Sequence, residues 1–301
     1  MVGCPMIPAP AWIDPESWEA FHDMRRKIKA PLTPYAEKLI VRELVKHRIV
    51  CQFSCGAASA VATKLALAEH GDKCVILNAE IEEEHPDNRR FAEDCQRWFG
   101  REIITLRDTK YGASAVRVFE TVGYIKGPHG AACTSRIKRG LLRTFEQPGD
   151  VLVLGFTAEE RHRYDDWLED WPDRPIIAPL IDRGLTKKDC KAMVERAGIK
   201  LPAMYLLGYD NANCIGCVKG GLGYWRAIRE DFPAQFERMA QAEEKVAGLH
   251  GENAYILRHR SGPLAGKRFP LRELPAGKAH RGEPLPSCGL FCESAEQEYS
   301  A

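Results

Sequence analysis

Residues 49–71 read IVCQFSCGAASAVATKLALAEHG, and this stretch decides the fold. Its first five residues, IVCQF, are apolar enough to form a buried strand, and SAVATKLALAEHG has the composition of a helix. The residues between them, 54–58, are all small. A short apolar strand that passes through a tight loop into a helix is the repeating unit of parallel sheets, so the stretch predicts an α/β protein.

The same alternation continues along the chain. Further strands are predicted in CVILNAE (74–80), EIITLR (102–107) and DVLVLGF (150–156), and helices over residues 87–99 and 186–198. We therefore expect a mostly parallel, doubly wound sheet. It would form a nucleotide-binding domain over residues 49–207, preceded by a helical appendage at 1–48. Residues 208–301 would form an irregular region with a CxxC, a helical segment and a cysteine-containing tail.

Composition limits the classes of partner. Lys and Arg number 43 and Asp and Glu number 42, so the overall charge gives no reason to expect nucleic acid or an anionic membrane. A local basic cluster could contact a nucleic-acid backbone or form an ordinary solvated loop. It consists of Arg258, His259, Arg260, Lys267, Arg268 and Arg272. Short apolar runs and the absence of a secretion signal predict no membrane span, and eleven cysteines then indicate reduced thiols in the cytoplasm.

The loop from Phe53 to Ser59 has the properties of a phosphate cradle. Small side chains would let backbone amides and two hydroxyls approach an anion at the N-terminus of the following helix. The loop lacks the lysine of the common P-loop and does not match GxGxxG, so neither of those nucleotide folds is supported. A tight turn that is small for steric reasons alone is the alternative.

Ser54-x-Gly56-x-x-Ser59 resembles the pyrophosphate loop of the adenine nucleotide alpha hydrolase-like (PP-loop ATP pyrophosphatase) superfamily, in its phosphoadenosine phosphosulfate reductase-like branch. CVILNAEIEEEHPDNRRF, CTSRIKRGLL and GFTAEERHR resemble later segments of that branch in the same order, and the resemblance covers roughly residues 49–230. ATP-hydrolysing relatives carry a Gly-Gly pair and an Asp in the loop, where this chain has Cys55-Gly56 and Ala58. ATP and a sulfated adenylate therefore both remain open as the nucleotide, with Mg²⁺ as a possible companion.

The resemblance implies a set of nucleotide-binding residues. These are Ser54, Cys55, Gly56, Ala57, Ser59, Asn78, Glu80, Arg136 and Gly155, with His85 to Asp87 facing the same cleft. It also implies that Lys138, Arg161 and Arg163 would neutralise charge that develops on phosphoryl oxygens.

Cys214-Ile215-Gly216-Cys217 is a CxxC in a loop, and its two thiolates could belong to a zinc knuckle, a redox pair or a metal cluster. The family resemblance adds Cys133 as a third thiolate and implies a four-iron four-sulfur cluster. Cluster-bearing reductases of this branch carry a Cys-Cys pair at that point, whereas residue 132 is Ala. Three thiolates would leave one iron open, as in relatives that thiolate nucleic acid, and a fourth from the tail would close the cluster.

The tail sequence Ser287-Cys288-Gly289-Leu290-Phe291-Cys292 resembles the Glu-Cys-Gly-Leu-His of sulfonucleotide reductases. Cys288 is accordingly a candidate for either the fourth cluster ligand or the catalytic nucleophile, and Cys292 could serve either role or neither. The cysteines within the predicted strands and helices are expected to be small buried hydrophobic residues. These are Cys51, Cys74, Cys95 and Cys190.

Together these features predict an ATP-dependent sulfur-handling enzyme that adenylylates a nucleic acid or nucleotide and delivers sulfur through the cluster. One alternative is a sulfonucleotide reductase with Cys288 as nucleophile. Another is a catalytically silent nucleotide-binding module of a larger complex. We further expect a sulfur or electron donor protein as a partner and association into a homo-oligomer. We do not expect association with a membrane.

Overall fold

The computed structural model describes residues 48–127, 130–171 and 174–285, together with residues 16, 18–20, 22 and 23. Those few N-terminal residues are helical, as predicted. The rest of the predicted helical appendage lies outside the described residues, and so do Cys288 and Cys292. Among the described helices, none combines the length and apolar character needed to cross a membrane.

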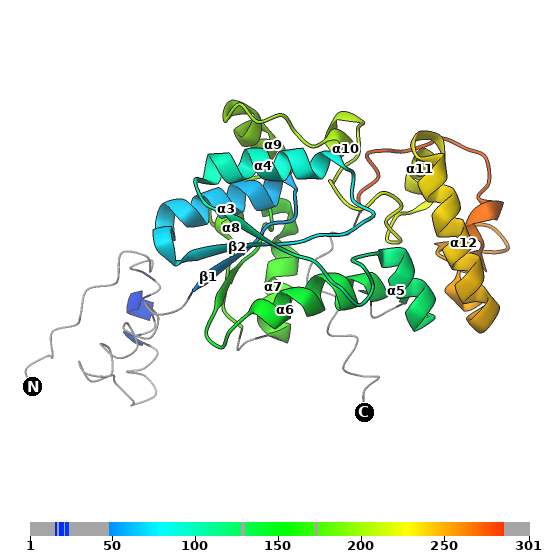
Figure 1. Ribbon diagram of the computed structural model, residues 1–301, viewed down its shortest axis with the longest axis horizontal. Helices are drawn as coiled ribbons and strands as arrows, with labels where there is room; N and C mark the ends of the chain where they lie inside the picture. The colour runs from blue at the N-terminus through cyan, green and yellow to red at the C-terminus, as the bar shows by residue number, and fades with distance from the viewer. Residues whose placement is uncertain are drawn as a thin grey trace, which may run out of the picture.

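A five-stranded parallel sheet forms the centre of the molecule (Figure 1), which confirms the predicted α/β class. The strand order is β3-β2-β1-β6-β7, and every neighbouring pair is parallel. The strands are β1 (Ile49–Gln52), β2 (Cys74–Ala79), β3 (Ile103–Leu106), β6 (Val151–Val153) and β7 (Ile176–Ile177). Short apolar runs suffice because the sheet is covered on both sides, so each strand is buried on both faces.

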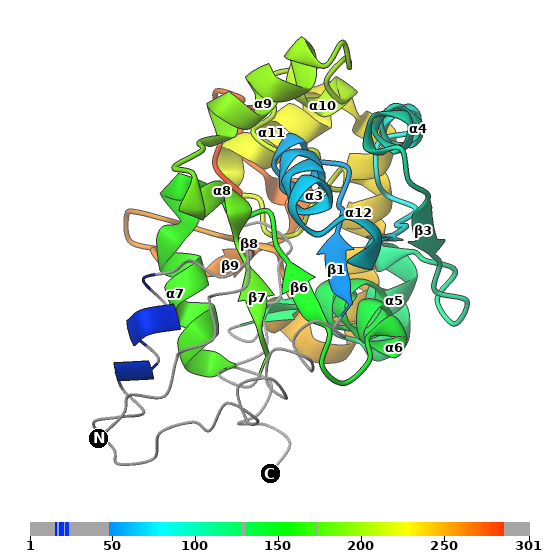
Figure 2. The ribbon, with the colours of Figure 1, turned by 90° about the vertical axis from the view of Figure 1, so that its left-hand side faces the viewer.

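Helices cover the two faces of the sheet, which makes it doubly wound (Figure 2). One layer contains α3 (Ala57–His70), α4 (Asp87–Phe99), α8 (Pro179–Asp182) and α9 (Lys187–Arg196); the other contains α6 (Gly140–Phe145) and α7 (Arg161–Asp170). Successive residues of β1 point to opposite faces: Cys51 packs in the core beneath α3, and Val50 packs in the core with Leu142 and Trp167.

Local capping sets where several helices begin and end. Thr186 accepts the Asp189 N–H and the Asp189 carboxylate accepts the Thr186 N–H, so this capping box starts α9 one residue after Thr186. The predicted helix WRAIREDFPAQFERMAQAEEKV is divided into α11 (Leu222–Asp231) and α12 (Pro233–His250). Proline disfavours helical backbone in the residue before it, and Phe232 accordingly has φ −137° and ψ 61°.

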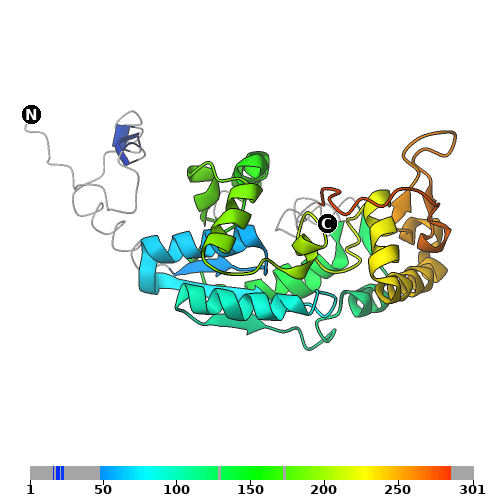
Figure 3. The same cartoon turned by 90° about the horizontal axis from the view of Figure 1, so that it is seen from above.

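The C-terminal part of the described chain lies beyond the carboxyl ends of the strands (Figures 1 and 3). Here α11 and α12 pack with α5 (Ala115–Val122) around one hydrophobic core. Shorter elements complete this region: β4 (Lys126–Gly127) pairs with β5 (Gly130–Ala131), β8 (Leu257–Arg258) pairs with β9 (Arg268–Phe269), and α10 (Ala203–Leu206) links it to the sheet. This arrangement covers the end of the sheet where the loops after β1, β2 and β6 emerge.

The strand order reverses direction at β1, because β2 and β3 lie on one side of it and β6 and β7 on the other. In open parallel sheets such a reversal creates a crevice outside the carboxyl ends of the two central strands, and ligands bind there. In this protein the crevice falls between the loop after β1, which is the candidate phosphate cradle, and the Leu154–Phe156 segment after β6.

Candidate functional site

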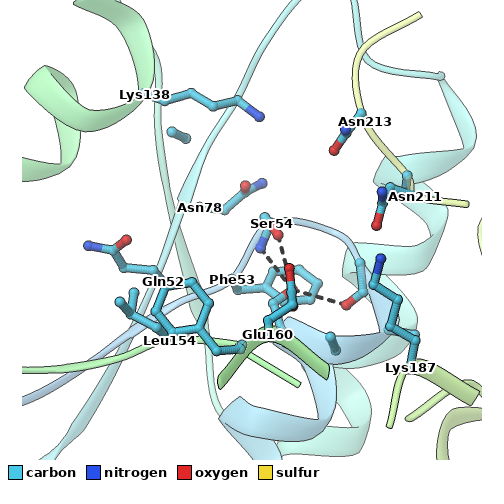
Figure 4. A pocket seen from close by; sticks show the side chains of 18 of the residues that line it. Gln52, Phe53, Ser54, Asn78, Lys138, Leu154, Glu160, Lys187, Asn211 and Asn213 are labelled. Atoms are coloured by element: carbon cyan, nitrogen blue, oxygen red, sulfur yellow. Dashed lines mark hydrogen bonds between the residues drawn. The ribbon is translucent and has the colours of Figure 1, made fainter. Parts of the chain in front are cut away.

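A cavity of about 160 Å³ lies at this reversal point. Figure 4 shows Gln52 and Leu154 on one side of it and Lys187, Asn211 and Asn213 on the other. Seven of the predicted site residues line it: Ser54, Gly56, Ala57, Ser59, Asn78, Lys138 and Gly155. We call this space the switch-point cavity.

The loop after β1 presents hydroxyl and amide groups to this cavity. Ser59 Oγ accepts the Ser54 N–H at 3.1 Å and donates to the Gly56 carbonyl at 3.0 Å, so the two serines close the loop. Helix α3 begins after Gly56 without a side-chain cap, which leaves first-turn N–H groups facing the loop. A Cβ on Gly56 would lie 3.4 Å from Tyr205 Oη and 3.9 Å from both serine Oγ atoms. Three hydroxyls therefore surround the one position without a side chain, an arrangement that suits an anion.

Gly155, after β6, and Cys55, in the loop after β1, are constrained by close packing and by backbone conformation respectively. Gly155 approaches the first turn of α3 so closely that a Cβ would lie 2.9 Å from the Ser59 Cα and N atoms. Cys55 adopts a left-handed backbone with φ 55°, a conformation that a non-glycine residue rarely takes. Its side chain is buried in the core beneath α3 and does not line the cavity, and burial raises the pKa of its thiol well above the usual value.

Three side chains of the cavity wall carry buried polar atoms that have no hydrogen-bond partner within the described chain. They are Asn78 Oδ1, Thr134 Oγ1 and Asn213 Nδ2. Buried polar groups in native proteins are nearly always satisfied, since an unsatisfied one costs about 1–3 kcal/mol. One acceptor, one hydroxyl and one amide donor of the cavity wall thus lack a partner among the described residues.

Charged residues reach the cavity from several elements. Lys138 Nζ lies 3.2 Å from Glu84 Oε1, and both side chains are largely buried. Lys187 pairs with Asp210 at 2.8 Å on the opposite wall. Lys191 lies over the Tyr205 ring, with Nζ 4.5 Å from the ring centroid. The wall thus supplies three lysines within a crevice that also contains apolar surface, the combination expected of a phosphate-bearing ligand.

Several predicted residues lie away from the cavity. Glu80 comes one residue after β2 ends and pairs with Arg107 at 2.6 Å. Arg136 is exposed and does not line the cavity, and Arg161 pairs with Asp165 at 3.4 Å on the surface of α7. Arg163 binds Glu160, which is itself a cavity residue, and lines a different hollow described below.

His85 and Asp87 connect other elements instead of facing the cavity. The His85 ring lies edge-on to Phe232, with 6.0 Å between ring centroids. The Asp87 carboxylate accepts the Ala203 N–H at 2.9 Å and pairs with Arg90, and the Arg90 hydrogen bond holds the pKa of Asp87 below its usual value.

Cys133, Cys214 and Cys217 line a second, smaller cavity of about 20 Å³, which we call the thiol cavity. Cys133 immediately precedes a π-helical segment, Thr134–Arg139, and such segments are frequent at functional sites. Thr134 and Lys138 line both this cavity and the switch-point cavity. Residues 81 and 83, α5 and Met239 supply the remaining walls. The three cysteines predicted to act together therefore meet directly beside the candidate nucleotide site.

One buried tyrosine makes hydrogen bonds to the backbone of the CxxC loop. Tyr224 Oη accepts the N–H groups of Gly216 at 3.1 Å and Cys217 at 2.9 Å and donates to the Cys214 carbonyl at 3.1 Å. The Ile215 N–H donates to the Glu83 carbonyl at 2.8 Å, which ties the loop to the segment after β2. Burial, together with the nearby Cys217, raises the pKa of Tyr224 well above its usual value, so it remains a neutral donor.

Glu83 is a buried carboxylate beside the thiols, but its hydrogen bonds give it a structural role. It accepts the Ser114 hydroxyl at 2.6 Å and the Ala115 N–H at 2.8 Å, both at the N-terminus of α5. Within the described part of the chain, no three His, Cys, Asp or Glu side chains are grouped so that they could hold a single metal ion. The three cysteines line the thiol cavity together with mostly apolar residues.

The cysteines predicted to be small buried hydrophobic residues are confirmed as such. Cys51, Cys74, Cys95 and Cys190 are all at most 1% exposed and belong to the core beneath α3 and α9. Burial raises the pKa of both Cys95 and Cys190 to about 12. Burial thus disfavours the thiolate form of Cys95 and Cys190.

Sequence reasoning missed much of the opposite wall. Lys187, Lys191, Tyr205, Asp210 and Asn213 all line the switch-point cavity. Only the two lysines carried a usable signal, because their i, i+4 spacing places them on one face of the predicted helix. The others come from a stretch without periodicity.

No protein-family model matches this chain, and no curated protein is significantly similar to it in sequence.

Proposed function

We propose that this protein is an adenine-nucleotide-dependent sulfur-handling enzyme of the phosphoadenosine phosphosulfate reductase-like, PP-loop type, and that it acts on a nucleic acid or nucleotide. The observation that carries the proposal is the shared wall between the two cavities. Thr134 and Lys138 border the candidate nucleotide site on one side and three cysteines on the other. A nucleotide-activated group and a sulfur-bearing group could meet across such a wall.

The nucleotide half of the proposal is supported by the cradle around Gly56 and by the unsatisfied polar atoms. Ser54, Ser59 and the first-turn amides of α3 would bind phosphate oxygens, and the positive end of the helix favours their charge. Asn78 Oδ1 and Asn213 Nδ2 would bind the polar edges of the base or sugar. Leu154 and Phe156 supply apolar surface for a purine ring.

The cysteine half fits a soft metal centre. Thiolates select zinc or iron–sulfur clusters over hard cations, and here they line a cavity whose exposed surface is apolar. A four-iron cluster takes its thiolates on different iron atoms, and each of the three thiols that line this cavity could hold one iron. Cys133, Cys214 and Cys217 would hold such a cluster. When bound, it would supply either electron transfer or a site for sulfide.

The protein's own contribution to the first step is orientation and charge neutralisation. An acceptor oxygen would attack the α-phosphorus of ATP, forming an O–P bond while the bond to the leaving pyrophosphate breaks. Lys138, and across the cavity Lys187, would stabilise negative charge that grows on the phosphoryl oxygens. A sulfide donor would then displace AMP from the activated acceptor. The buried walls would limit hydrolysis of the adenylate.

Anaerobic purification followed by iron and acid-labile sulfide analysis tests the thiol cavity. Wild type should contain about four irons per chain, and Cys133→Ser should lose most of them. Cys95→Ala is the matched control, since it removes a buried cysteine that lines neither cavity. Zinc in place of iron, or iron that survives loss of Cys133, would contradict the cluster assignment.

Nucleotide turnover is measured separately, with ATP labelled at the α-phosphate. AMP and pyrophosphate should form in the presence of an acceptor, and Ser59→Ala should weaken ATP binding. Binding without turnover under all acceptor conditions would instead indicate a nucleotide-binding module. Release of sulfite from a sulfated adenylate, with ATP inert, would indicate a reductase.

A further inference from the structure

A third hollow, of about 750 Å³, lies beside the thiol cavity. Its walls come from β4 and β5, from residues 219–222, from the hairpin of β8 and β9, and from Arg163 on α7. Figure 2 shows the β8–β9 hairpin beside α7. We call this hollow the basic groove, because six Lys and Arg side chains and one histidine line it: Lys126, Arg163, Lys219, Arg258, His259, Arg260 and Arg268.

The side chains that line this groove carry positive charge, and two of them pair with carboxylates outside the lining: Arg163 with Glu160 and Arg260 with Glu283. Among the described residues that line it, none is Asp or Glu, although the whole chain is nearly neutral. Arg258 and Arg268 lie on paired strands directly opposite each other, and like charges in that position oppose one another. Burial and the Arg258 charge lower the pKa of Arg268, and burial lowers the pKa of Lys126 to about 8. An anionic ligand would relieve this repulsion.

The groove adjoins both cavities of the proposed site. Residues 130–133 pass from the groove wall to Cys133, and residues 217–222 pass from Cys217 back to the groove. Lys126 Nζ donates to the carbonyl oxygen of Val218, which lines the thiol cavity. On the other side, Arg163 binds Glu160 of the switch-point cavity. Groups that project from a ligand in the groove would therefore lie next to the thiol cavity and the switch-point cavity.

An exposed aromatic side chain stands at the groove. Tyr124 is 41% exposed, and its hydroxyl would lie 2.2 Å from a Cβ placed on Gly127 in the groove wall. Aromatic side chains next to basic residues are the usual arrangement for single-stranded nucleic acid, because bases stack on the ring while the phosphates contact the cations. A flat anionic membrane would not enter a concave groove.

We propose that the basic groove binds the phosphodiester backbone of a nucleic acid and delivers one of its bases to the wall between the thiol and switch-point cavities. The second part rests on the proposed function, whereas backbone binding does not. RNA and DNA share this backbone chemistry, and the experiment separates them. An acidic polypeptide is the alternative ligand that the experiment must exclude.

Fluorescence anisotropy with labelled single-stranded RNA and DNA of the same sequence, and no added nucleotide, tests the proposal on the full chain. The logarithm of the binding constant should fall linearly with the logarithm of salt concentration, with a slope of about −0.7 for each phosphate contact on a single strand. Arg258→Ala/Arg260→Ala should reduce the steepness by about 1.4 and weaken binding on the order of tenfold at low salt. Tighter binding of one polymer would identify the source of the backbone.

The matched control is Arg89→Ala/Arg97→Ala. It removes the same charge from two side chains of α4 that are 90% and 71% exposed and line none of the three hollows. Equal weakening by both double variants would overturn the proposal, because binding would then follow net charge alone. Unchanged binding in the groove variant, or equally effective competition by polyglutamate, would also overturn it.

ATP titration of the same variants keeps the two proposals apart. If the groove variant binds both ATP and nucleic acid as wild type does, the proposal for the basic groove fails and the proposed function stands. If wild type binds oligonucleotides through the groove but never binds an adenine nucleotide, the proposed function fails and the groove assignment stands.

Discussion

The hydroxyl of Tyr224 accepts the amide N–H of Cys217 at 2.9 Å, and the same oxygen accepts the Gly216 N–H and donates to the Cys214 carbonyl. One buried hydroxyl therefore contacts three backbone groups of the CxxC loop. Gly216 has φ 77°, so the loop also requires a glycine where it turns above Trp225. The conformation of the loop that carries Cys214 and Cys217 therefore depends on a residue that does not line the thiol cavity.

Tyr224→Phe should loosen this loop without filling or emptying the core. It removes the acceptor of the buried Gly216 N–H, whereas the Cys217 N–H keeps the Cys214 carbonyl at 3.1 Å, so the expected cost is about 1–3 kcal/mol in the free energy of unfolding. Alkylation of Cys217 should become faster, since the loop opens more often. Urea denaturation and the rate of thiol modification provide the two measurements.

Tyr209→Phe is the control for that prediction. Tyr209 packs against the Tyr224 ring, but its hydroxyl donates to Asp231 at 2.8 Å, away from the cysteines. It should lower stability and leave Cys217 alkylation slow. If both variants expose Cys217 equally, the Tyr224 hydroxyl has no special role in holding the loop.

The loop between β1 and α3 could be predicted from sequence because it is local. Strand, small residues and helix follow one another within residues 49–71, and the structure places Ser54, Gly56 and Ser59 on the cavity wall. The side-chain direction of Cys55 could not be predicted, since it depends on a left-handed backbone that sequence patterns do not favour at a non-glycine residue.

Most of the opposite wall of the switch-point cavity could not be predicted from the sequence, for a different physical reason. Tyr205 contacts the Ala57 amide at 3.3 Å across 148 residues of chain. Such contacts arise from how helices dock on the sheet, and the loop from 207 to 213 has no hydrophobic period to reveal them. Glu80 shows the converse case: its motif suggested the nucleotide cleft, whereas the structure places it after the end of β2 at Ala79, with its carboxylate paired to Arg107.

Gly155→Ala should impair nucleotide binding while preserving the fold. The added methyl group would lie 2.9 Å from the Ser59 backbone, so the first turn of α3 must move away from β6. We expect ATP binding to weaken on the order of tenfold or more, because anion contacts at a helix N-terminus depend on its position. Isothermal titration calorimetry measures the change.

Gly248→Ala provides the matched substitution. Gly248 lies within α12 and a Cβ there meets nothing within 4 Å. The change should stabilise the helix by about 0.5–1 kcal/mol and leave ATP affinity unaltered. If Gly155→Ala also binds ATP normally, the close approach of β6 to α3 does not shape the nucleotide site.

Lys138→Met should reduce the turnover of ATP by more than its loss of folding free energy can account for. Lys138 and Glu84 form a largely buried pair, so the single variant should cost about 1–3 kcal/mol of folding free energy. The double variant Glu84→Gln/Lys138→Met should recover part of this stability, because the buried carboxylate is also removed. Turnover should stay reduced on the order of 10²-fold or more in both variants, because neither has the Lys138 ammonium group that would stabilise negative charge on the phosphoryl oxygens. Recovery of turnover together with stability would show that Lys138 acts only in folding.

Glu243 should make stability depend on pH. It is fully buried on α12, and its carboxylate accepts the Ile256 and Leu271 N–H groups, which flank the β8–β9 hairpin of the basic groove, at 2.6 Å each. Burial outweighs these hydrogen bonds and raises the pKa of Glu243 to about 7 from the ordinary value of 4.5. The folded state thus binds this proton more tightly than the unfolded state does. Its stabilising contribution is fully present below pH 4.5 and is lost as the pH rises through 7.

The measurement compares wild type with Glu243→Gln, which cannot titrate at this position. The stability of wild type relative to the variant should fall by up to about 3 kcal/mol between acidic and neutral pH, because each unit of pKa shift corresponds to about 1.4 kcal/mol. Urea denaturation at several pH values gives this difference. The control is Glu252→Gln, which removes an exposed carboxylate from the short helix that follows α12 and should retain the wild-type dependence of stability on pH. A constant difference between wild type and Glu243→Gln would show that Glu243 titrates at the same pH in the folded and unfolded protein. The Ile256 and Leu271 hydrogen bonds would then offset the effect of burial, and Glu243 would be an ionised carboxylate at neutral pH.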